Sequence, residues 1–81
     1  MILKGKFLSN NFEQEIPSGA VNGSNVTFGL SSLPLSNKSV LVYLNGLLLI
    51  QGTHYTISNQ TITFAGAPQL GQQVYATYFK R

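Results

Sequence analysis

The stretch "VLVYLNGLLLIQGTHYTI", residues 40–57, decides the fold of this chain. At its centre stands the dipeptide Asn45-Gly46, which between two apolar runs is a strong signal for a β-hairpin with a two-residue turn. The turn predicts two antiparallel strands, over residues 40–44 and 47–50. The apolar run is too short to cross a bilayer as a helix, which needs about 20 apolar residues.

A two-residue turn also fixes which side chains share a face, because successive side chains of a strand alternate between its two faces. One face of the predicted hairpin holds Val40, Val42, Leu44, Leu47 and Leu49. The other face holds Leu41, Tyr43, Leu48 and Ile50. Both faces are apolar, whereas an outer sheet of a sandwich has one solvated face with polar residues at alternate positions. The sequence leaves open which face turns inward, and either choice leaves an apolar face that needs a cover.

In other parts of the chain apolar and polar residues alternate, as they do in half-buried strands, and no segment shows the 3.6-residue period of a helix. Five further short strands are predicted, over residues 12–16, 26–30, 55–57, 61–64 and 73–79. In the first of them, Phe12, Gln14 and Ile16 share one side, and we interpret Glu13 and Glu15 as the solvated side. About seven short antiparallel strands are typical of an all-β, immunoglobulin-like or fibronectin-like sandwich, with a small barrel as the alternative.

Residues 1–11, "MILKGKFLSNN", precede this β region, and we interpret them as an extended N-terminal arm. The chain then divides into the arm and one sandwich domain over residues 12–81. The apolar residues of the arm are Ile2, Leu3, Phe7 and Leu8. The arm could fold back on its own domain or pair with an edge strand of a neighbouring subunit by β-strand addition, and we expect the second.

Size and composition favour self-association. A domain this small buries only about 60% of its unfolded-chain surface, and such domains often add disulfides, metals or oligomerisation. Cysteine is absent, and His54, Glu13 and Glu15 are the only histidine and acidic residues, so neither a disulfide nor a metal site is expected. The hairpin face that contains Tyr43 is therefore expected to contact a neighbouring subunit, and cover by loops or the arm of the same chain is the alternative.

Charge and titratable groups are sparse. The net charge is +3, and the few cationic side chains do not form the dense basic footprint that nucleic-acid binding requires. Acid–base or nucleophilic catalysis needs positioned titratable groups, and one histidine and two glutamates do not supply a recognisable set. No catalytic residue, cofactor or membrane attachment is expected. Tyr43, Tyr55, Tyr75 and Tyr78 could stack on sugar rings, although tyrosines at alternate strand positions usually pack in the domain.

Four segments, in this order, resemble a small β-sandwich module of structural proteins from tailed bacteriophages: "IPSGAVNGSNVTFGL", "SVLVYLNGLLLIQGTHYTIS", "ITFAGAP" and "GQQVYATYFK". The resemblance covers about residues 15–80. It implies a non-enzymatic virion protein, assembled in the host bacterial cytoplasm, whose partners are the phage capsid or other virion proteins. Because the module has only a short arm beside it, a capsid cement or decoration protein is expected, acting as a homo-oligomer such as a trimer. The alternative is a tail-fibre or adhesion module that binds a host-surface glycan.

Overall fold

Seven β-strands and one short 3-10 helix form the described part of the chain, which is residues 11–81 of this computed structural model. The elements are β1 (Phe12–Glu15), β2 (Thr27–Gly29), η1 (Asn37–Ser39), β3 (Leu41–Leu44), β4 (Leu47–Leu48), β5 (Tyr55–Ser58), β6 (Thr61–Phe64) and β7 (Val74–Phe79). Each strand coincides with one predicted from the sequence, with end points that differ by at most two residues. The expected arm lies outside the described residues except for Asn11, and so do its predicted contact residues Ile2, Leu3, Phe7 and Leu8.

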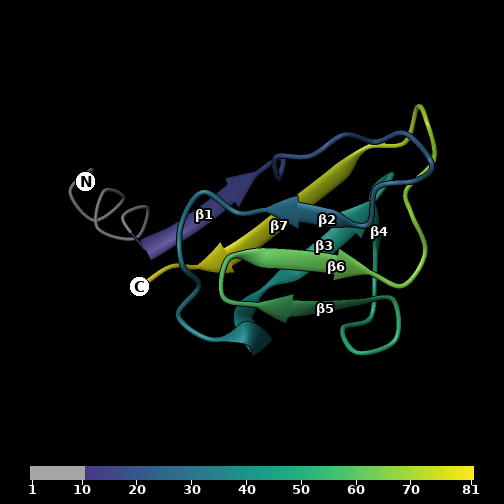
Figure 1. Ribbon diagram of the computed structural model, residues 1–81. Helices are drawn as coiled ribbons and strands as arrows, with labels where there is room; N and C mark the ends of the chain where they lie inside the picture. The colour runs from purple at the N-terminus through teal and green to yellow at the C-terminus, as the bar shows by residue number, and fades with distance from the viewer. Residues whose placement is uncertain (1–10) are drawn as a thin grey trace.

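The strands pair into two antiparallel sheets, one in the order β1-β7-β3-β4 and one in the order β2-β6-β5. In Figure 1 the three-stranded sheet lies in front of β7 and β3, so the two sheets form the layers of a sandwich-like fold rather than one closed barrel. The start of β1 and the end of β7 lie at the same end of these layers, where the backbone N–H of Lys80 donates to the carbonyl of Asn11 at 2.8 Å. The predicted all-β architecture is confirmed.

The core lies between the two sheets and consists of the inward side of each alternating strand. Its buried residues are Phe28, Leu30, Val40, Val42, Tyr55, Ile57, Ile62, Phe64, Val74, Ala76 and Tyr78. The rings of Phe28 and Phe64 meet edge to face with centroids 5.3 Å apart. The hydroxyl of Tyr55 donates to the carbonyl of Val40 at 2.9 Å, so its polar end is satisfied, while burial raises the pKa of this tyrosine. Burial of each large side chain contributes about 1.5–3 kcal/mol to holding the layers together.

The hairpin between β3 and β4 has the predicted register. Residues 45–46 both adopt positive φ, 53° and 82°, as a type I′ turn requires. Leu44 then faces Leu47, and Tyr43 faces Leu48. The turn therefore sets the two faces of the ribbon as the sequence indicates.

Packing against the second sheet decides which hairpin face is inside. Val40 and Val42 are fully buried, and Leu44 and Leu49 pack against the same core cluster. The opposite face, with Tyr43 at its centre, consequently points away from the second sheet. The same side of β7 carries Tyr75, Thr77 and Phe79, since Val74, Ala76 and Tyr78 alternate with them toward the core.

The prediction that Glu13 and Glu15 form the solvated side of the first strand, β1, was wrong. Its register on β7 places Glu15 opposite Ala76 and Glu13 opposite Tyr78, and both of these partners belong to the core. The carboxylate of Glu15 accepts a hydrogen bond from the hydroxyl of buried Tyr78, and it also accepts from the backbone N–H and the hydroxyl of Ser31 at 3.1 Å each. An edge position with three donors accommodates a carboxylate on the core side. The outward side of β1 carries Phe12 and Gln14 instead.

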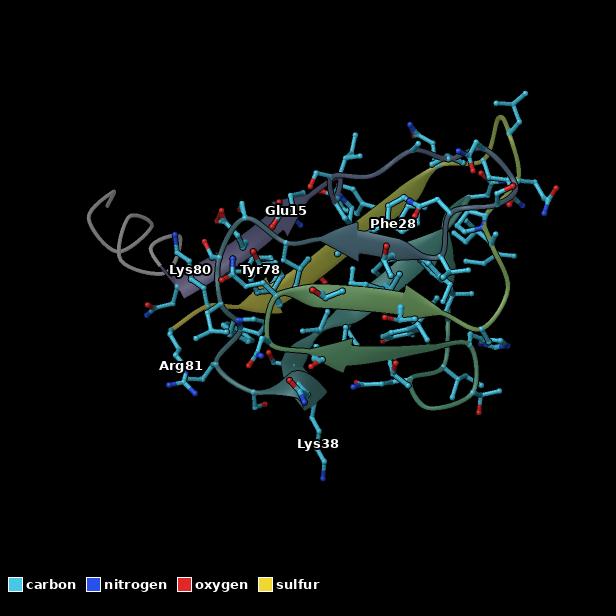
Figure 2. The ribbon with its side chains drawn as sticks, viewed as in Figure 1. Glu15, Phe28, Lys38, Tyr78, Lys80 and Arg81 are labelled. Carbon is cyan, nitrogen blue, oxygen red and sulfur yellow. The ribbon has the colours of Figure 1, made fainter. Side chains whose placement is uncertain are left out.

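The hydroxyl of Tyr78 joins this cluster at the end of the sandwich where the chain terminates (Figure 2). It accepts a hydrogen bond from the N–H of Ser32 at 3.2 Å while it donates to Glu15. Burial raises the pKa of Tyr78, and the hydrogen bond to Glu15 raises it further. The cluster links β1, β7 and the segment after β2, and so fastens the edge strand that carries Phe12 and Gln14.

After β1 the chain crosses from the four-stranded sheet to the three-stranded sheet. Ser18 and Gly29 exchange two backbone hydrogen bonds, of 2.9 Å and 2.8 Å, which attach this crossing to the end of β2. The next residue, Gly19, has a φ of +152° and lies against the ring of Phe28, where an added Cβ would come within 2.5 Å of the ring. Glycine is required here both by its backbone conformation and by the close approach.

Candidate functional site

The outward faces of the two sheets differ sharply in polarity. The outer face of β2-β6-β5 is lined by Thr27, Gly29, Thr56, Ser58, Thr61 and Thr63, with Thr27 opposite Thr63 and Thr63 opposite Thr56. Hydroxyl-bearing residues at alternate positions are what a solvated strand face carries. This face follows the ordinary pattern and offers no unusual feature.

The outer face of the four-stranded sheet is apolar and aromatic. We call it the outer apolar face, and it consists of Phe12, Gln14, Leu41, Tyr43, Leu48, Tyr75, Thr77 and Phe79. Its only polar groups are two side-chain hydroxyls of tyrosine, one of threonine and one amide. A contiguous surface of this kind is uncommon on monomeric proteins and usually marks an interaction site.

Strand register arranges these side chains in rows across the sheet. Phe12 pairs with Phe79, and their rings are 5.3 Å apart at an interplanar angle of 56°. In a second row Thr77 lies between Gln14 on β1 and Leu41 on β3. In a third row Tyr43 lies between Tyr75 on β7 and Leu48 on β4. Directly opposed residues on one face have Cβ atoms about 4.5–5.5 Å apart, so each row is continuous.

Three of the hairpin residues predicted as contacts, Leu41, Tyr43 and Leu48, lie on the outer apolar face, and the fourth, Ile50, is exposed beyond the end of β4. Leu41 is 41% exposed, Leu48 is 54% exposed and Ile50, just after β4, is 61% exposed, while Tyr43 is partly exposed. No segment within residues 12–81 covers them. Their contact with a partner stays a prediction, and so does that of the four arm residues, which lie outside the described part of the chain.

None of the residues that form this face is charged. Glu13 and Glu15 point to the core side of β1, and the ammonium of Lys80 approaches the carboxylate of Glu13 at 3.7 Å. Figure 2 shows Lys80 and Arg81 at the end of the sandwich where the chain terminates, and Lys38 projecting from η1. The outer apolar face is therefore uncharged and suited to an uncharged partner surface.

A shallow groove of about 400 Å³ crosses the middle of the face. Its lining residues are Gln14, Tyr43, Gly46, Gln73, Tyr75 and Thr77. The turn at Asn45 is tied to the start of β7, because the N–H of Gln73 donates to the Asn45 side-chain oxygen at 2.8 Å and the N–H of Asn45 donates to the Gln73 carbonyl at 2.9 Å. These bonds hold one end of the groove in shape.

Sequence reasoning identified Tyr43 as a contact residue but missed Gln14, Gln73 and Thr77. The alternation of the last strand puts Tyr75 and Thr77 on one side together, but it does not say which side faces outward. The neighbours of Gln14 could not be predicted in this way, because they depend on the pairing of β1 with β7, which lies at the other end of the sequence. A strand order of this kind leaves no local pattern in the chain.

His54 has a structural role in the turn before β5. Its Nδ1 accepts a hydrogen bond from the N–H of Ile50 at 2.9 Å, and the N–H groups of Thr53 and His54 both donate to the Ile50 carbonyl. The backbone groups of Ile50 are therefore occupied, which limits strand addition at this end of β4. Within residues 11–81, no group of three or more histidine, cysteine or acidic side chains is placed to hold a metal ion.

No protein-family model matches this chain, and a search among curated proteins finds no match. In the part of the chain that the structure describes, no helix has the length and apolar character that a membrane crossing requires.

Proposed function

We propose that this chain is a non-enzymatic structural protein of a bacteriophage virion, and that it attaches to the assembled capsid as a cement or decoration protein. The observation that carries the proposal is the outer apolar face, which is exposed and uncharged although the opposite sheet presents a normal hydroxyl-rich surface. The assignment to a phage virion is supported by the resemblance over about residues 15–80.

Covering the face would supply the free energy of attachment. Leu41, Leu48 and Phe79 are each about half exposed, so folding has realised only part of their transfer free energy. Full burial of such a side chain is worth about 1.5–3 kcal/mol, and the unrealised part is therefore about 1 kcal/mol for each. A protein that binds the assembled shell better than its free subunits stabilises the shell by mass action.

The proposal also includes attachment through the N-terminal arm and assembly into a homo-oligomer. Residues 1–11, through Ile2, Leu3, Phe7 and Leu8, would add a second apolar attachment to the partner. The protein would act as a homo-oligomer such as a trimer, since a domain of this size has a small core of its own. Light scattering of the full chain tests the oligomer directly.

The fold we propose in detail is an immunoglobulin-like sandwich with one displaced strand. The order β2-β6-β5 corresponds to strands B-E-D of immunoglobulin domains, and β7-β3-β4 corresponds to F-C-C′. In this reading β1 takes the edge position beside F that the last strand, G, takes in immunoglobulin domains. These correspondences support the proposal.

The deciding experiment compares attachment of variants to purified phage shells that lack the protein. The double variant Leu41→Gln and Leu48→Gln should attach at least about tenfold more weakly, since about 1.4 kcal/mol of lost burial corresponds to a factor of ten. The matched control changes Thr56→Gln and Ser58→Gln on the other sheet, and it should attach normally. Deleting residues 1–11 should also prevent attachment while the β fold persists.

Normal attachment of the folded Leu41/Leu48 variant would overturn the proposal. Circular dichroism and urea unfolding of each variant separate loss of attachment from loss of folding, because both leucines are outside the core and the domain should remain folded without them.

A further inference from the structure

The edge of the four-stranded sheet at β1 has a pattern of charge and backbone groups that one segment of this chain matches. We infer that residues 3–7, "LKGKF", of the same chain pair antiparallel with β1 as a fifth strand, with Lys6 opposite Glu13 and Phe7 opposite Phe12. Residues 1–10 lie outside the described part of the structure, and their sequence supplies the match. The inference goes beyond the proposed function, because it concerns how the sheet edge is closed and does not require a capsid.

β1 is an edge strand with backbone groups directed outward. It stands first in the order β1-β7-β3-β4 and pairs only with β7 among the described strands. The N–H of Lys80 donates to the carbonyl of Asn11 at 2.8 Å, so Asn11 and the alternate residues after it direct their backbone groups toward β7. The backbone groups of Phe12 and Gln14 therefore point away from β7. Such an edge is a template for one more strand.

The other sheet edges are partly closed by described residues. On β2 the side chain of Asn25 donates to the carbonyl of Thr27 at 2.9 Å and accepts from its N–H at 3.3 Å. On β5 the carbonyl of Tyr55 accepts a hydrogen bond of 2.7 Å from the preceding turn. After β4 both backbone groups of Ile50 are occupied. Within residues 11–81, no backbone hydrogen bond outside the strand ladders involves Phe12 or Gln14, so β1 is the edge best suited to accept a strand.

Side-chain charge selects the strand that fits. Glu13 and Glu15 are the only acidic residues of the chain and lie on the same side of β1, and among the described residues only Lys80 forms an ion pair with either. Lys4 and Lys6 have the same two-residue spacing. Antiparallel pairing that sets Lys6 opposite Glu13 also sets the second lysine opposite Glu15. Opposite charges directly across two strands are stabilising and like charges are destabilising, which disfavours pairing of β1 with β1 of a second copy.

The other side of the same segment matches the outer apolar face. In this register Phe7 lies opposite Phe12, and Leu3 follows on the same side of the strand. Phe12 pairs with Phe79 across β7, so Phe7 extends this aromatic row by one strand. The fifth strand would therefore enlarge the outer apolar face at the β1 edge.

The length of the connection identifies the source of the segment as the same chain. Residues 8–11, "LSNN", separate Phe7 from Phe12. Hairpin loops of about two to five residues are usual, and serine and asparagine are favoured in turns. A segment tethered this closely meets its own edge at a high effective concentration, so the arm of a second copy competes poorly. The sequence alone favoured a neighbouring subunit, and the position of β1 at the sheet edge, directly after the arm, favours the same chain instead.

Disulfide trapping tests the pairing, because the chain has no cysteine of its own. Directly opposed residues have Cβ atoms about 4.5–5.5 Å apart, which a disulfide can bridge after a small adjustment. Under mild oxidation with glutathione, the full chain carrying Lys6→Cys and Glu13→Cys should form a disulfide within one chain, as seen by non-reducing electrophoresis and mass spectrometry. The matched control, Lys6→Cys with Thr56→Cys on the other sheet, should form its disulfide at least about tenfold more slowly.

Hydrogen exchange of the full chain without cysteines gives a second readout. The backbone amides of Phe12 and Gln14 should be protected, as in a strand with neighbours on both sides. The double variant Lys4→Glu and Lys6→Glu sets like charges opposite both glutamates and should reduce this protection about tenfold or more. Lys38→Glu, which makes the same change of charge on η1, should leave it unchanged.

Three results would overturn the inference: a disulfide that links two chains, equal trapping rates in the test and control pairs, or unprotected amides at Phe12 and Gln14 in the wild-type chain. A link between two chains would assign the edge to the arm of a second copy. Shell attachment is measured separately with the Leu41/Leu48 double variant. If trapping fails while that variant loses attachment, the inference fails and the proposed function stands. If trapping succeeds while that variant attaches normally, the proposed function fails and the inference stands.

Discussion

Replacing Gly19 with alanine tests how the first strand is fastened to the rest of the sandwich. Gly19 follows the Ser18–Gly29 bridge that carries the chain from one sheet to the other, and its φ is +152°. A Cβ at this position would lie 2.5 Å from Cδ2 of Phe28 and 3.0 Å from Cε2. Neither the backbone nor the ring can easily relieve the contact, because Phe28 is nearly fully buried and packs edge to face on Phe64.

The expected loss has two parts. Holding a residue with a side chain in a sparsely populated backbone region costs about 1–3 kcal/mol. Forcing extra volume into a packed core costs about another 1–3 kcal/mol. The sum, roughly 2–6 kcal/mol, is a large fraction of the total stability, because a domain of this length typically has a free energy of unfolding of about 4–12 kcal/mol. Gly19→Ala should therefore leave a marginally stable or unfolded protein.

Urea unfolding followed by circular dichroism measures this loss, and Gly66→Ala supplies the matched control. Gly66 has no positive φ, and no atom lies within 4 Å of the position its Cβ would take. That change should be neutral or stabilising by up to about 1 kcal/mol, because it reduces the freedom of the unfolded chain. A Gly19→Ala variant that unfolds within about 0.5 kcal/mol of the wild type would refute the close approach of Gly19 to Phe28.

Two further predictions concern the buried tyrosines. Burial raises the pKa of Tyr55 and Tyr78 above 10.0, so the unfolded chain loses these two protons at lower pH than the folded chain. The contribution of the two tyrosines to the free energy of unfolding should be fully present below about pH 10 and should fall above it, by up to about 1.4 kcal/mol per pH unit for each tyrosine. Urea unfolding measured across this pH range should show the decline, and its absence would contradict the prediction. Glu15→Gln removes the charged acceptor of the Tyr78 and Ser31 donors and should lower the free energy of unfolding by about 1–2 kcal/mol. Glu13→Gln is its control and should lose less than about 1 kcal/mol, because it breaks only a partly exposed ion pair. Equal losses in the two variants would contradict the larger contribution expected of the Glu15 cluster.

Much of the strand structure could be predicted because the information is local. Alternation, or an apolar run between turn residues, marked the seven strands, and Asn45-Gly46 set both the position and the register of the central hairpin through its two positive φ angles. The sequence also predicted that Val74, Ala76 and Tyr78 lie on one side of β7, because alternate residues of a strand share a face in any fold.

The candidate site depended on how the strands are assembled. The apolar outward face of the hairpin was one of two possibilities, and the groove joins Gln14, Tyr43 and Thr77, which come from three separate strands and meet only in the order β1-β7-β3. The sidedness of β1 was mistaken because hydrophobicity alone suggested that Phe12 turns inward and Glu15 outward. The donors that reverse this choice, Tyr78 and Ser31, are remote in the sequence.

The sequence by itself thus determined the strands, the central turn and the division of each strand into two sides. Tertiary structure decided which side became the core. The physical reason is that alternation relates neighbouring side chains to one another without favouring either side, so the choice is made only when a strand meets the sheet that covers it. For this chain the second sheet covers Val40 and Val42, and that contact leaves Leu41, Tyr43 and Leu48 on the outside.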